Sequence, residues 1–197
     1  REFAAKTEAE RKKVFTQLLL SPVLHTDCTN ALLNGKSAYV FICASPDGKA
    51  LYFARQKKGH KGVEGTPVQD YDGIIVQDHE ATFYQYGSDH QECLAHVLRA
   101  LKDSMENEPD RSWNKEMHSH MQEMIHYRNS LEEGEECDPE VVSGFEARYR
   151  QILQKAKEEY EYLPPNKYYK KGHNLSIRLE EYMHNHFLFL YDQRVPA

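Results

Sequence analysis

The 197-residue sequence lacks any apolar run approaching the ~18 residues that a membrane-spanning helix needs. Its first segment, REFAAKTEAERKKVF, has no apolar core of the signal-peptide type. These two absences exclude a membrane protein and a secreted precursor from the expected classes. We therefore expect a soluble protein without a membrane partner, located in the cytoplasm.

Cysteine and positive charge are both scarce. The four cysteines are too few and too scattered for a disulfide framework, so reduced thiols are expected. The 25 Lys and Arg residues are outnumbered by 31 Asp and Glu residues, which gives a net charge of −6. Because nucleic-acid phosphates favour basic surfaces, any DNA contact should rely on local basic patches.

The N-terminal half predicts a helix followed by strands. Residues 3–20 place apolar side chains at helical spacing, and Pro22 ends this lead-in helix. The next apolar runs are rich in β-branched and aromatic residues and are separated by short turn sequences, among them Asn34-Gly35. Such runs predict an antiparallel meander. They cover residues 23–33, 37–45 and 50–56.

A glycine-containing loop over 57–71 precedes a fourth strand, the continuous apolar run GIIVQD at 73–78. From there the pattern is helical, and it becomes charged and methionine-rich after Glu106. The predicted helices cover about 92–105, 116–127 and 141–162, and a last apolar helix covers 174–191.

Two aspartates fall on the predicted buried strands: Asp27 lies in the middle of the first, and Asp78 ends the fourth. Buried carboxylates are costly, and two converging ones repel each other unless a cation joins them. Carboxylate oxygens are the ligands that Mg²⁺ and Mn²⁺ prefer, and a pair of such ions supports phosphodiester chemistry. The alternative is that Asp78 is a turn or cap residue.

Four sequence blocks resemble, in the same order, those of the insertion sequence 66 family of bacterial transposases. LHTDCTNALLNGKSAYVFICAS resembles its first catalytic strand and hairpin, and GIIVQDHEATFYQYG resembles its second block, where TDGYAGY is usual. ECLAHVLRAL resembles its CWAHARR block, and FLFLYDQRVPA resembles the start of its FLTDPRVPIDNNLAER block. The resemblance spans about residues 20–197.

The resemblance implies a DDE transposase with an α/β, ribonuclease H-like core, in which a mixed sheet combines a three-strand antiparallel meander with a parallel strand. It implies a lead-in helix over 1–21, the first part of the catalytic core over 22–105, and an α-helical insertion over 106–172. Residues 173–197 would form a helix that returns to the core.

The resemblance also implies the chemistry. Asp27 and Asp78 would be the first two catalytic carboxylates and would bind Mg²⁺ or Mn²⁺ in a two-metal site. These ions would activate water for strand cleavage and then the freed 3′ hydroxyl for attack on target DNA. The third carboxylate, a glutamate, is expected in the NNLAER segment just after Ala197, so we expect this chain to be inactive by itself. The complete enzyme is expected to be a homo-oligomer acting on transposon ends and target DNA at the bacterial nucleoid.

Two residues depart from the family pattern near these aspartates. Cys28 stands where the family often has glutamate, which does not affect metal binding. His79 stands where the family usually has glycine. This second departure puts in question the backbone geometry directly after Asp78.

Cys93 and His96 are one helical turn apart and share a face. The resemblance implies that Cys93 is packed and that His96 faces the catalytic cleft. The alternative is a zinc site, which would need two further ligands. The candidates for those ligands are His118, His120, His126 and Cys137.

Two basic clusters are candidate DNA-binding segments, and the alternative for each is an ordinary polar loop. The second interleaves tyrosine with lysine, which suits contacts to phosphates and bases. The clusters are Lys57, Lys58 and Lys61, and then Lys167, Tyr168, Tyr169, Lys170 and Lys171.

Two other functions stay open. A different ribonuclease H-like nuclease, such as a resolvase or an exonuclease, would need its remaining carboxylates within this chain. A non-enzymatic helical adaptor would have Asp27 and Asp78 as separate surface residues that bind no metal. The candidates for the nuclease carboxylates are Asp89, Glu180, Glu181 and Asp192.

Overall fold

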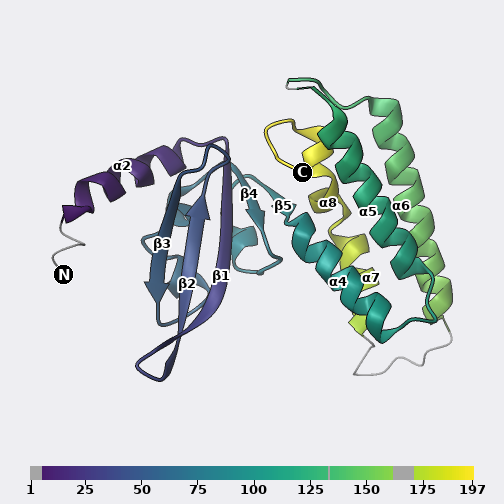
Figure 1. The fold of residues 1–197 in the computed structure, drawn as a ribbon, viewed down its shortest axis with the longest axis horizontal. Coiled ribbons are helices and arrows are strands. Elements are labelled where there is room, and N and C mark those ends of the chain that lie inside the picture. Colours follow the sequence, from purple (N-terminus) through teal and green to yellow (C-terminus); the bar gives the residue numbers. More distant parts are fainter. Residues whose placement is uncertain (1–5, 133, 162–170) are drawn as a thin grey trace. The chain divides into compact units, whose positions relative to one another are not determined.

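The structure is a computed structural model that describes residues 6–132, 134–161 and 171–197. The chain divides into two compact units, Arg1–Glu92 and Cys93–Ala197 (Figure 1). Their relative placement is not determined, so each is described by itself. None of the helices within the described ranges is long and apolar enough to cross a membrane.

The first unit, called the sheet unit, is built on a five-stranded mixed sheet in the order β3-β2-β1-β4-β5 (Figure 1). Strands β1, β2 and β3 pair antiparallel, whereas β4 is parallel to both β1 and β5. The elements are α2 (Glu8–Leu19), β1 (Val23–Leu33), β2 (Lys36–Ala44), β3 (Ala50–Arg55), α3 (His60–Val63), η1 (Pro67–Asp70), β4 (Ile74–Gln77), η2 (Phe83–Gln85) and β5 (Asp89–Glu92).

The predicted antiparallel meander is confirmed. Asn34 and Gly35 form its first turn with φ angles of 51° and 74°. Both values are positive, as a two-residue type I′ turn requires, and this turn matches the twist of the strands it joins. The turn fixes the register in which Leu33 faces Lys36 and, further along the strand, Asp27 faces Ile42.

Strand β5 was not predicted. Its sequence, Asp-His-Gln-Glu, contains no β-branched or aromatic residue, so side-chain propensity gives no strand signal. The strand forms because its backbone pairs in parallel with β4, from Ile74 opposite Asp89 to Gln77 opposite Glu92. Tertiary pairing therefore overrides the local sequence at this edge of the sheet.

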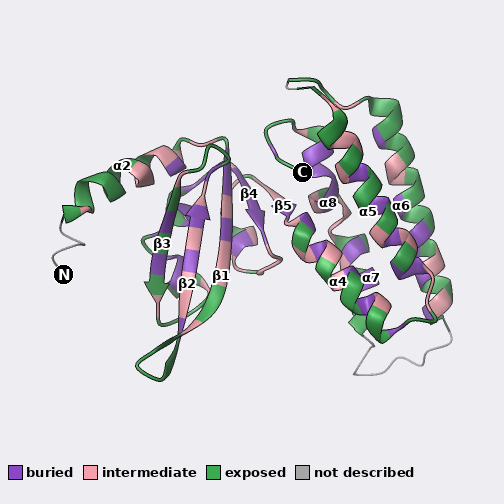
Figure 2. Cartoon of the chain, in the orientation of Figure 1, coloured by how far each residue is buried: buried purple, intermediate pink, exposed green. Residues whose placement is uncertain are grey.

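One face of the sheet carries the apolar core of this unit (Figure 2). Leu24 of β1, Phe41 of β2 and Ile75 of β4 are buried there, and Leu18 of α2 and Phe83 of η2 pack against them. Because side chains alternate along a strand, the neighbouring residues of β1 and β4 point to the opposite face. Asp27 belongs to that opposite set.

The second unit, called the helical unit, is α-helical in its described residues. Its core contains Trp113, Met117, Met121 and Tyr149, all essentially buried. The helix α6 begins after Asp138, whose side chain accepts a hydrogen bond of 2.8 Å from the Glu140 amide as an N-cap. The helices are α4 (Leu94–Asn107), α5 (Trp113–Ser130), α6 (Pro139–Tyr160), α7 (Lys171–Glu181) and α8 (Met183–Tyr191).

The last predicted helix is divided into α7 and α8 by a break at Tyr182, where φ is −106° and ψ is 25°. Beyond the break, residues 186–190 are buried without interruption. A straight helix packed on one side buries only a stripe, so the change of direction lets α8 bury its whole circumference. The insertion over 106–172 and the return of 173–197 to the core stay predictions.

Candidate active site at the carboxyl end of the parallel strands

The register between β1 and β4 relates the chain positions of Asp27 and Asp78. The two strands are parallel, and the last paired residues are His25 and Val76. Two residues further along each chain stand Asp27, still within β1, and Asp78, directly after β4. Since neighbouring strands lie about 4.8 Å apart, equivalent positions on them hold neighbouring side chains. Continued by two residues past its last pair, this register aligns Asp27 with Asp78 at the carboxyl end of β4.

The strand residues around the aspartates can be assigned to faces of the sheet. Leu24 and Ile75 are a register pair in the apolar core, so the alternating strand residues His25, Asp27 and Val76 point away from that core, and Asp78 follows the end of β4. Asp27 is half-buried. His25 is half-buried as well, and burial lowers its pKa, which favours a neutral imidazole beside the carboxylates.

The pKa of Cys28 depends on several charged residues around Asp27 and Asp78. Its pKa is raised, first by burial and further by the charges of Asp78, Asp27 and Glu80, whereas the charge of Lys58 lowers it. Both aspartates thus add to the negative potential at this thiol. The amide of Cys28 also donates a hydrogen bond of 2.6 Å to Oδ1 of Asp27. This bond fixes the orientation of the Asp27 carboxylate.

The residue after Asp78 stands where the resemblance implies glycine, and its backbone adopts a conformation that glycine favours. His79 has a φ of 70°, in the left-handed region that glycine enters without a steric penalty. The departure noted in the sequence therefore leaves the backbone geometry of a glycine in place. The chain then turns through Thr82 into η2, with Thr82 Oγ1 donating to Glu80.

The first basic cluster lies close to this edge through Lys58. Its Nζ is 5.4 Å from the centroid of the Tyr39 ring, a cation–π arrangement. Its charge acts on Cys28, as described above, while Lys57 and Lys61 are exposed. In the second cluster, Lys171 is the exposed first residue of α7. The remaining members, Lys167, Tyr168, Tyr169 and Lys170, lie outside the described residues.

Cys93 and His96 lie at the start of α4 in the helical unit. Cys93 is the half-buried N-cap residue, and the amide of His96 donates to its carbonyl at 2.9 Å. The packed role of Cys93 and the cleft-facing role of His96 stay predictions. Among the described residues, no three or more His, Cys, Asp or Glu side chains gather as a metal site. His120 instead bonds the carbonyl of Phe145 inside the core.

Of the carboxylates considered for a rival nuclease, Asp89 lies in the sheet unit, and Glu180, Glu181 and Asp192 lie in the helical unit. Asp89 pairs with Ile74, at the end of β4 remote from Asp78. Glu180 receives a hydrogen bond from Lys157, and Asp192 receives bonds from Arg194. The sequence interpretation missed Glu92, which ends β5 beside Gln77 and is buried. Its only sequence signal was an acidic residue just before the helix at Leu94, because the strand that carries it was not recognised.

The two aspartates form part of a donor set for a hard cation. Carboxylate oxygens on neighbouring rigid strands suit Mg²⁺ or Mn²⁺, and both side chains come from backbone that the sheet fixes. Since the described residues bring no third carboxylate to this pair, the pair supplies two ligands and a complete site needs more.

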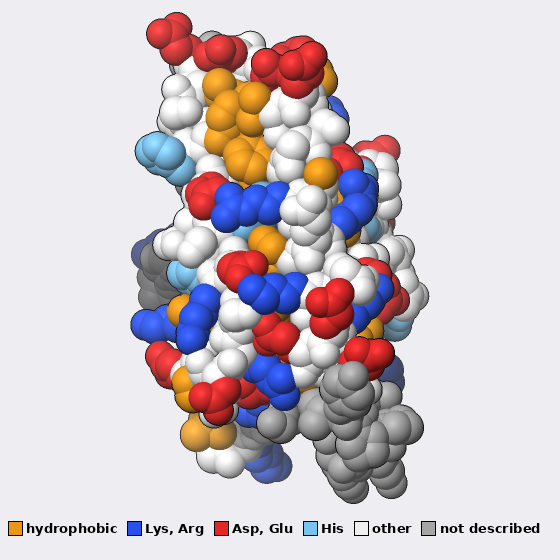
Figure 3. Space-filling model, turned by 90° about the vertical axis from the view of Figure 1, so that its right-hand side faces the viewer, with side chains coloured by type: hydrophobic (Ala, Val, Ile, Leu, Met, Phe, Trp, Pro, Cys, Tyr) orange, Lys and Arg blue, Asp and Glu red, His pale blue; other side chains and the backbone are white. Residues whose placement is uncertain are grey.

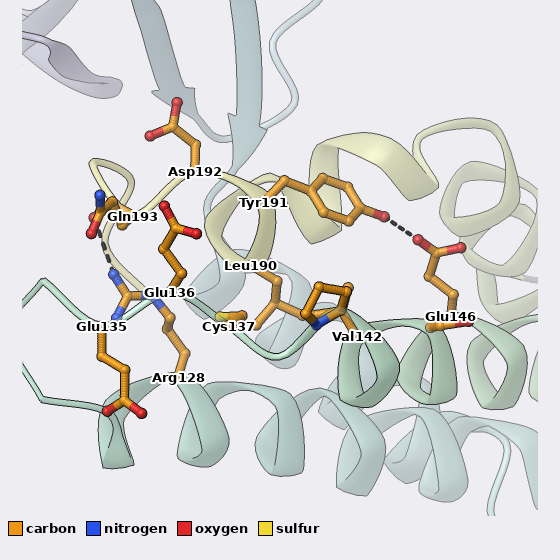
Figure 4. Close-up of a pocket in the computed structure, with 12 residues that line it drawn as sticks. Arg128, Glu135, Glu136, Cys137, Val142, Glu146, Leu190, Tyr191, Asp192 and Gln193 are labelled. Atoms are coloured by element: carbon orange, nitrogen blue, oxygen red, sulfur yellow. Dashed lines mark hydrogen bonds between the residues drawn. The ribbon is translucent and has the colours of Figure 1, made fainter.

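A pocket of about 580 Å³ lies within the helical unit, between the α5–α6 connection and the end of α8 (Figure 4). Tyr191 donates a hydrogen bond of 2.6 Å to Glu146 across its rim, and burial raises the pKa of Tyr191. Arg128 donates to the carbonyl of Gln193 at 3.0 Å. These two contacts form part of the pocket wall.

Acidic and basic side chains alternate over the visible face of the helical unit (Figure 3). Ion pairs join Arg148 to Glu123 and Lys157 to Glu180 on its surface. Such pairing neutralises the charges locally, so the described part of this face presents no continuous basic surface for DNA.

Comparison with known proteins gives one family. Residues 2–197 match the family described as "Transposase IS66 family", and this match covers nearly the whole chain. No curated protein matches the chain, and no solved structure matches it. The order of motifs, the mixed α/β fold and this match agree, and the chain belongs to the IS66 transposase family.

Proposed function

We propose that this chain forms the catalytic core of a DDE transposase and that Asp27 and Asp78 are its first two catalytic carboxylates. The β1–β4 register, which gives the two aspartates equivalent positions, is the observation that carries the proposal. Membership of the IS66 transposase family supports a function in DNA transposition. The strand order, with an antiparallel meander followed by two parallel strands, supports a ribonuclease H-like core.

The proposed role of the chain is to bind metal ions and to position DNA. Asp27 and Asp78 would bind Mg²⁺ or Mn²⁺, together with a third acidic ligand from outside this pair. When bound, such ions activate a water or a 3′ hydroxyl and stabilise the leaving oxygen of the phosphodiester. The strand backbone and the Cys28 amide restrict the Asp27 carboxylate to one orientation. Fixed ligands reduce the reorganisation that the transition state would otherwise require.

Lys58 is proposed to contact a DNA phosphate beside this edge, with Lys57 and Lys61 extending the same patch. A lysine works as a mobile point charge, which suits a phosphate whose position varies between DNA sequences. The net charge of −6 limits this contact to a local patch. The homo-oligomer and the action at the bacterial nucleoid stay predictions.

The first test is strand transfer with transposon-end DNA and Mn²⁺. It uses a chain extended by the acidic segment that the family resemblance places after Ala197. Asp27→Asn and Asp78→Asn should each abolish transfer and also weaken Mn²⁺ binding, measured by the loss of the free-ion signal in electron paramagnetic resonance. Each removes one anionic ligand and keeps the shape of the side chain.

Asp47→Asn is the matched control. Asp47 is an exposed turn residue of the same unit and accepts a hydrogen bond from Ser45. Its replacement should leave transfer and Mn²⁺ binding unchanged. Wild-type transfer by Asp27→Asn would contradict the proposal.

A further inference from the structure

The backbone after Asp78 adopts a conformation that is uncommon for residues other than glycine. Among the described non-glycine residues, only Asn34 and His79 have a positive φ. Asn34 sits in a hairpin turn that imposes this conformation, and asparagine tolerates it well. His79 belongs to no such turn. A histidine with a φ of 70° therefore needs contacts elsewhere that hold it.

The side chain of His79 is bound by two residues. Its Nδ1 donates to Oε1 of Glu92 at 2.5 Å, and the hydroxyl of Tyr84 donates to the same oxygen at 2.7 Å. The rings of His79 and Tyr84 meet edge to face, with centroids 5.9 Å apart. Tyr84 packs in turn on His90, with ring centroids 4.9 Å apart. We call Glu92, Tyr84 and His79 the clamp.

Glu92 is the central group of the clamp. It is 1% exposed, and a buried carboxylate is costly unless hydrogen bonds compensate it. It pairs in register with Gln77, the residue directly before Asp78. The acidic side chain is thus anchored on one strand and attached to the turn that follows the neighbouring strand.

Glu92 lies on the other face of the sheet from Asp27. Gln77 is two residues after Ile75, which faces the apolar core, and Glu92 pairs in register with Gln77. The clamp therefore acts on Asp78 through the backbone at 78–79. This placement makes Glu92 a positioning residue.

We propose that Glu92, with Tyr84, holds His79 in the left-handed conformation and thereby fixes the carboxylate of Asp78. The inference rests on the proposed metal site. It also explains why a strand as polar as β5 ends in a buried glutamate.

The test is a double-variant cycle with Mn²⁺ as the probe. Glu92→Gln removes the charge that strengthens both hydrogen bonds, and it should lower the affinity for Mn²⁺ about 10-fold. His79→Gly should bind Mn²⁺ as the wild type does, because glycine needs no clamp. The variant with both changes should recover that affinity. Tyr84→Phe should cause a smaller loss in the same direction.

Glu108→Gln is the matched control, because Glu108 is also buried and bonded by a tyrosine hydroxyl, Tyr160 at 3.0 Å. It should leave the Mn²⁺ affinity unchanged, and thermal melting verifies that each variant is folded. An equal loss from Glu92→Gln in the wild-type chain and in the His79→Gly variant would overturn the clamp, since Glu92 would then act through its charge alone.

A second readout separates the clamp from the metal site. Backbone ¹³C chemical shifts of Asp78 and His79 report the left-handed conformation without any metal. Glu92→Gln should move these shifts toward the ordinary β or α region. Unmoved shifts overturn the clamp. If Asp27→Asn leaves Mn²⁺ binding intact while Glu92→Gln moves the shifts, the proposed function fails and the clamp stands.

Discussion

The two units treat their partly buried carboxylates differently. In the helical unit, Glu159 accepts hydrogen bonds from the amides of Ser112 and Trp113 at the start of α5. Glu108 likewise accepts from the amide of Gly172 at 2.9 Å and from Tyr160. Glu159 and Glu108 each meet a helix N-terminus, where backbone amides and the helix dipole stabilise negative charge.

In the sheet unit, Asp27 and Asp78 each stand two residues beyond the last β1–β4 pair. After burial, the charges of Asp78, Asp27 and Glu80 further raise the pKa of Cys28. In the described part of that unit, the one helix of eight residues or more is α2, which precedes β1. Like charges placed together cost free energy, and a bound cation is the usual remedy. The comparison distinguishes carboxylates that stabilise the fold through hydrogen bonds from carboxylates suited to bind a cation.

The largest effect on stability should come from Gly172→Ala in the helical unit. A Cβ at this position would lie 2.6 Å from the hydroxyl of Tyr160 and 2.8 Å from that of Ser104, and nearer still to Glu108. Such overpacking costs about 3 kcal/mol. Denaturant unfolding should show that loss, while the Mn²⁺ affinity of the sheet unit stays unchanged.

Gly144→Ala provides the contrast within the same unit. No atom lies within 4 Å of a Cβ built there, in the middle of α6. Alanine should stabilise the helix by about 0.5–1 kcal/mol, because glycine loses more backbone entropy on folding. Equal effects of the two substitutions would show that the contacts around Gly172 are not tight.

How far the sequence predicts the molecule also differs between the units and their parts. The meander follows from local signals, since Asn34 and Gly35 specify the hairpin and the flanking residues favour strands. Asp27 could be found because it interrupts an apolar run. The break at Tyr182 could not be found, since the apolar pattern continues through it and the direction of α8 depends on tertiary packing.

The candidate site was predictable to the same limited degree. Asp27 and Asp78 follow from strands that the apolar pattern reveals, but their shared register depends on the parallel pairing of β1 with β4. Glu92 was missed because β5 is a strand only through its partner. The sequence showed that His79 stands where the resemblance implies glycine. Its positive φ angle could be found only from the structure.

An effect of intermediate size on the free energy of unfolding is expected when pH changes, because His120 titrates. It is fully buried, and burial lowers its pKa from the ordinary 6.5, although the Phe145 carbonyl counteracts this. The unfolded chain then binds a proton near pH 6.5 that the folded chain does not bind. Stability contributed by the neutral imidazole is therefore complete above pH 6.5 and falls as the pH drops toward the folded pKa, by at most about 1.4 kcal/mol per pH unit.

His120→Gln should flatten this dependence, because glutamine can still donate to the Phe145 carbonyl and does not titrate. Free energies of unfolding measured between pH 5 and 8 would give the slope for each variant. His126→Gln, which changes an exposed residue of the same helix, should retain the wild-type slope. Equal slopes for all three proteins would show that His120 does not control the acid sensitivity.

The smallest effect should distinguish lysines at the carboxylate edge from lysines of the helical unit. Lys58 lies over the ring of Tyr39, and its charge lowers the pKa of Cys28, whereas Lys157 forms an ion pair with Glu180. A lysine on a DNA phosphate releases a counterion, so Lys58→Ala should lower DNA affinity a few-fold and reduce the slope of log affinity against log salt by about 1. Lys157→Ala should change neither quantity, because Glu180 already neutralises that charge. If both variants weaken binding equally, the DNA contact is spread over the whole chain, and the carboxylate edge is not the preferred position of the phosphate.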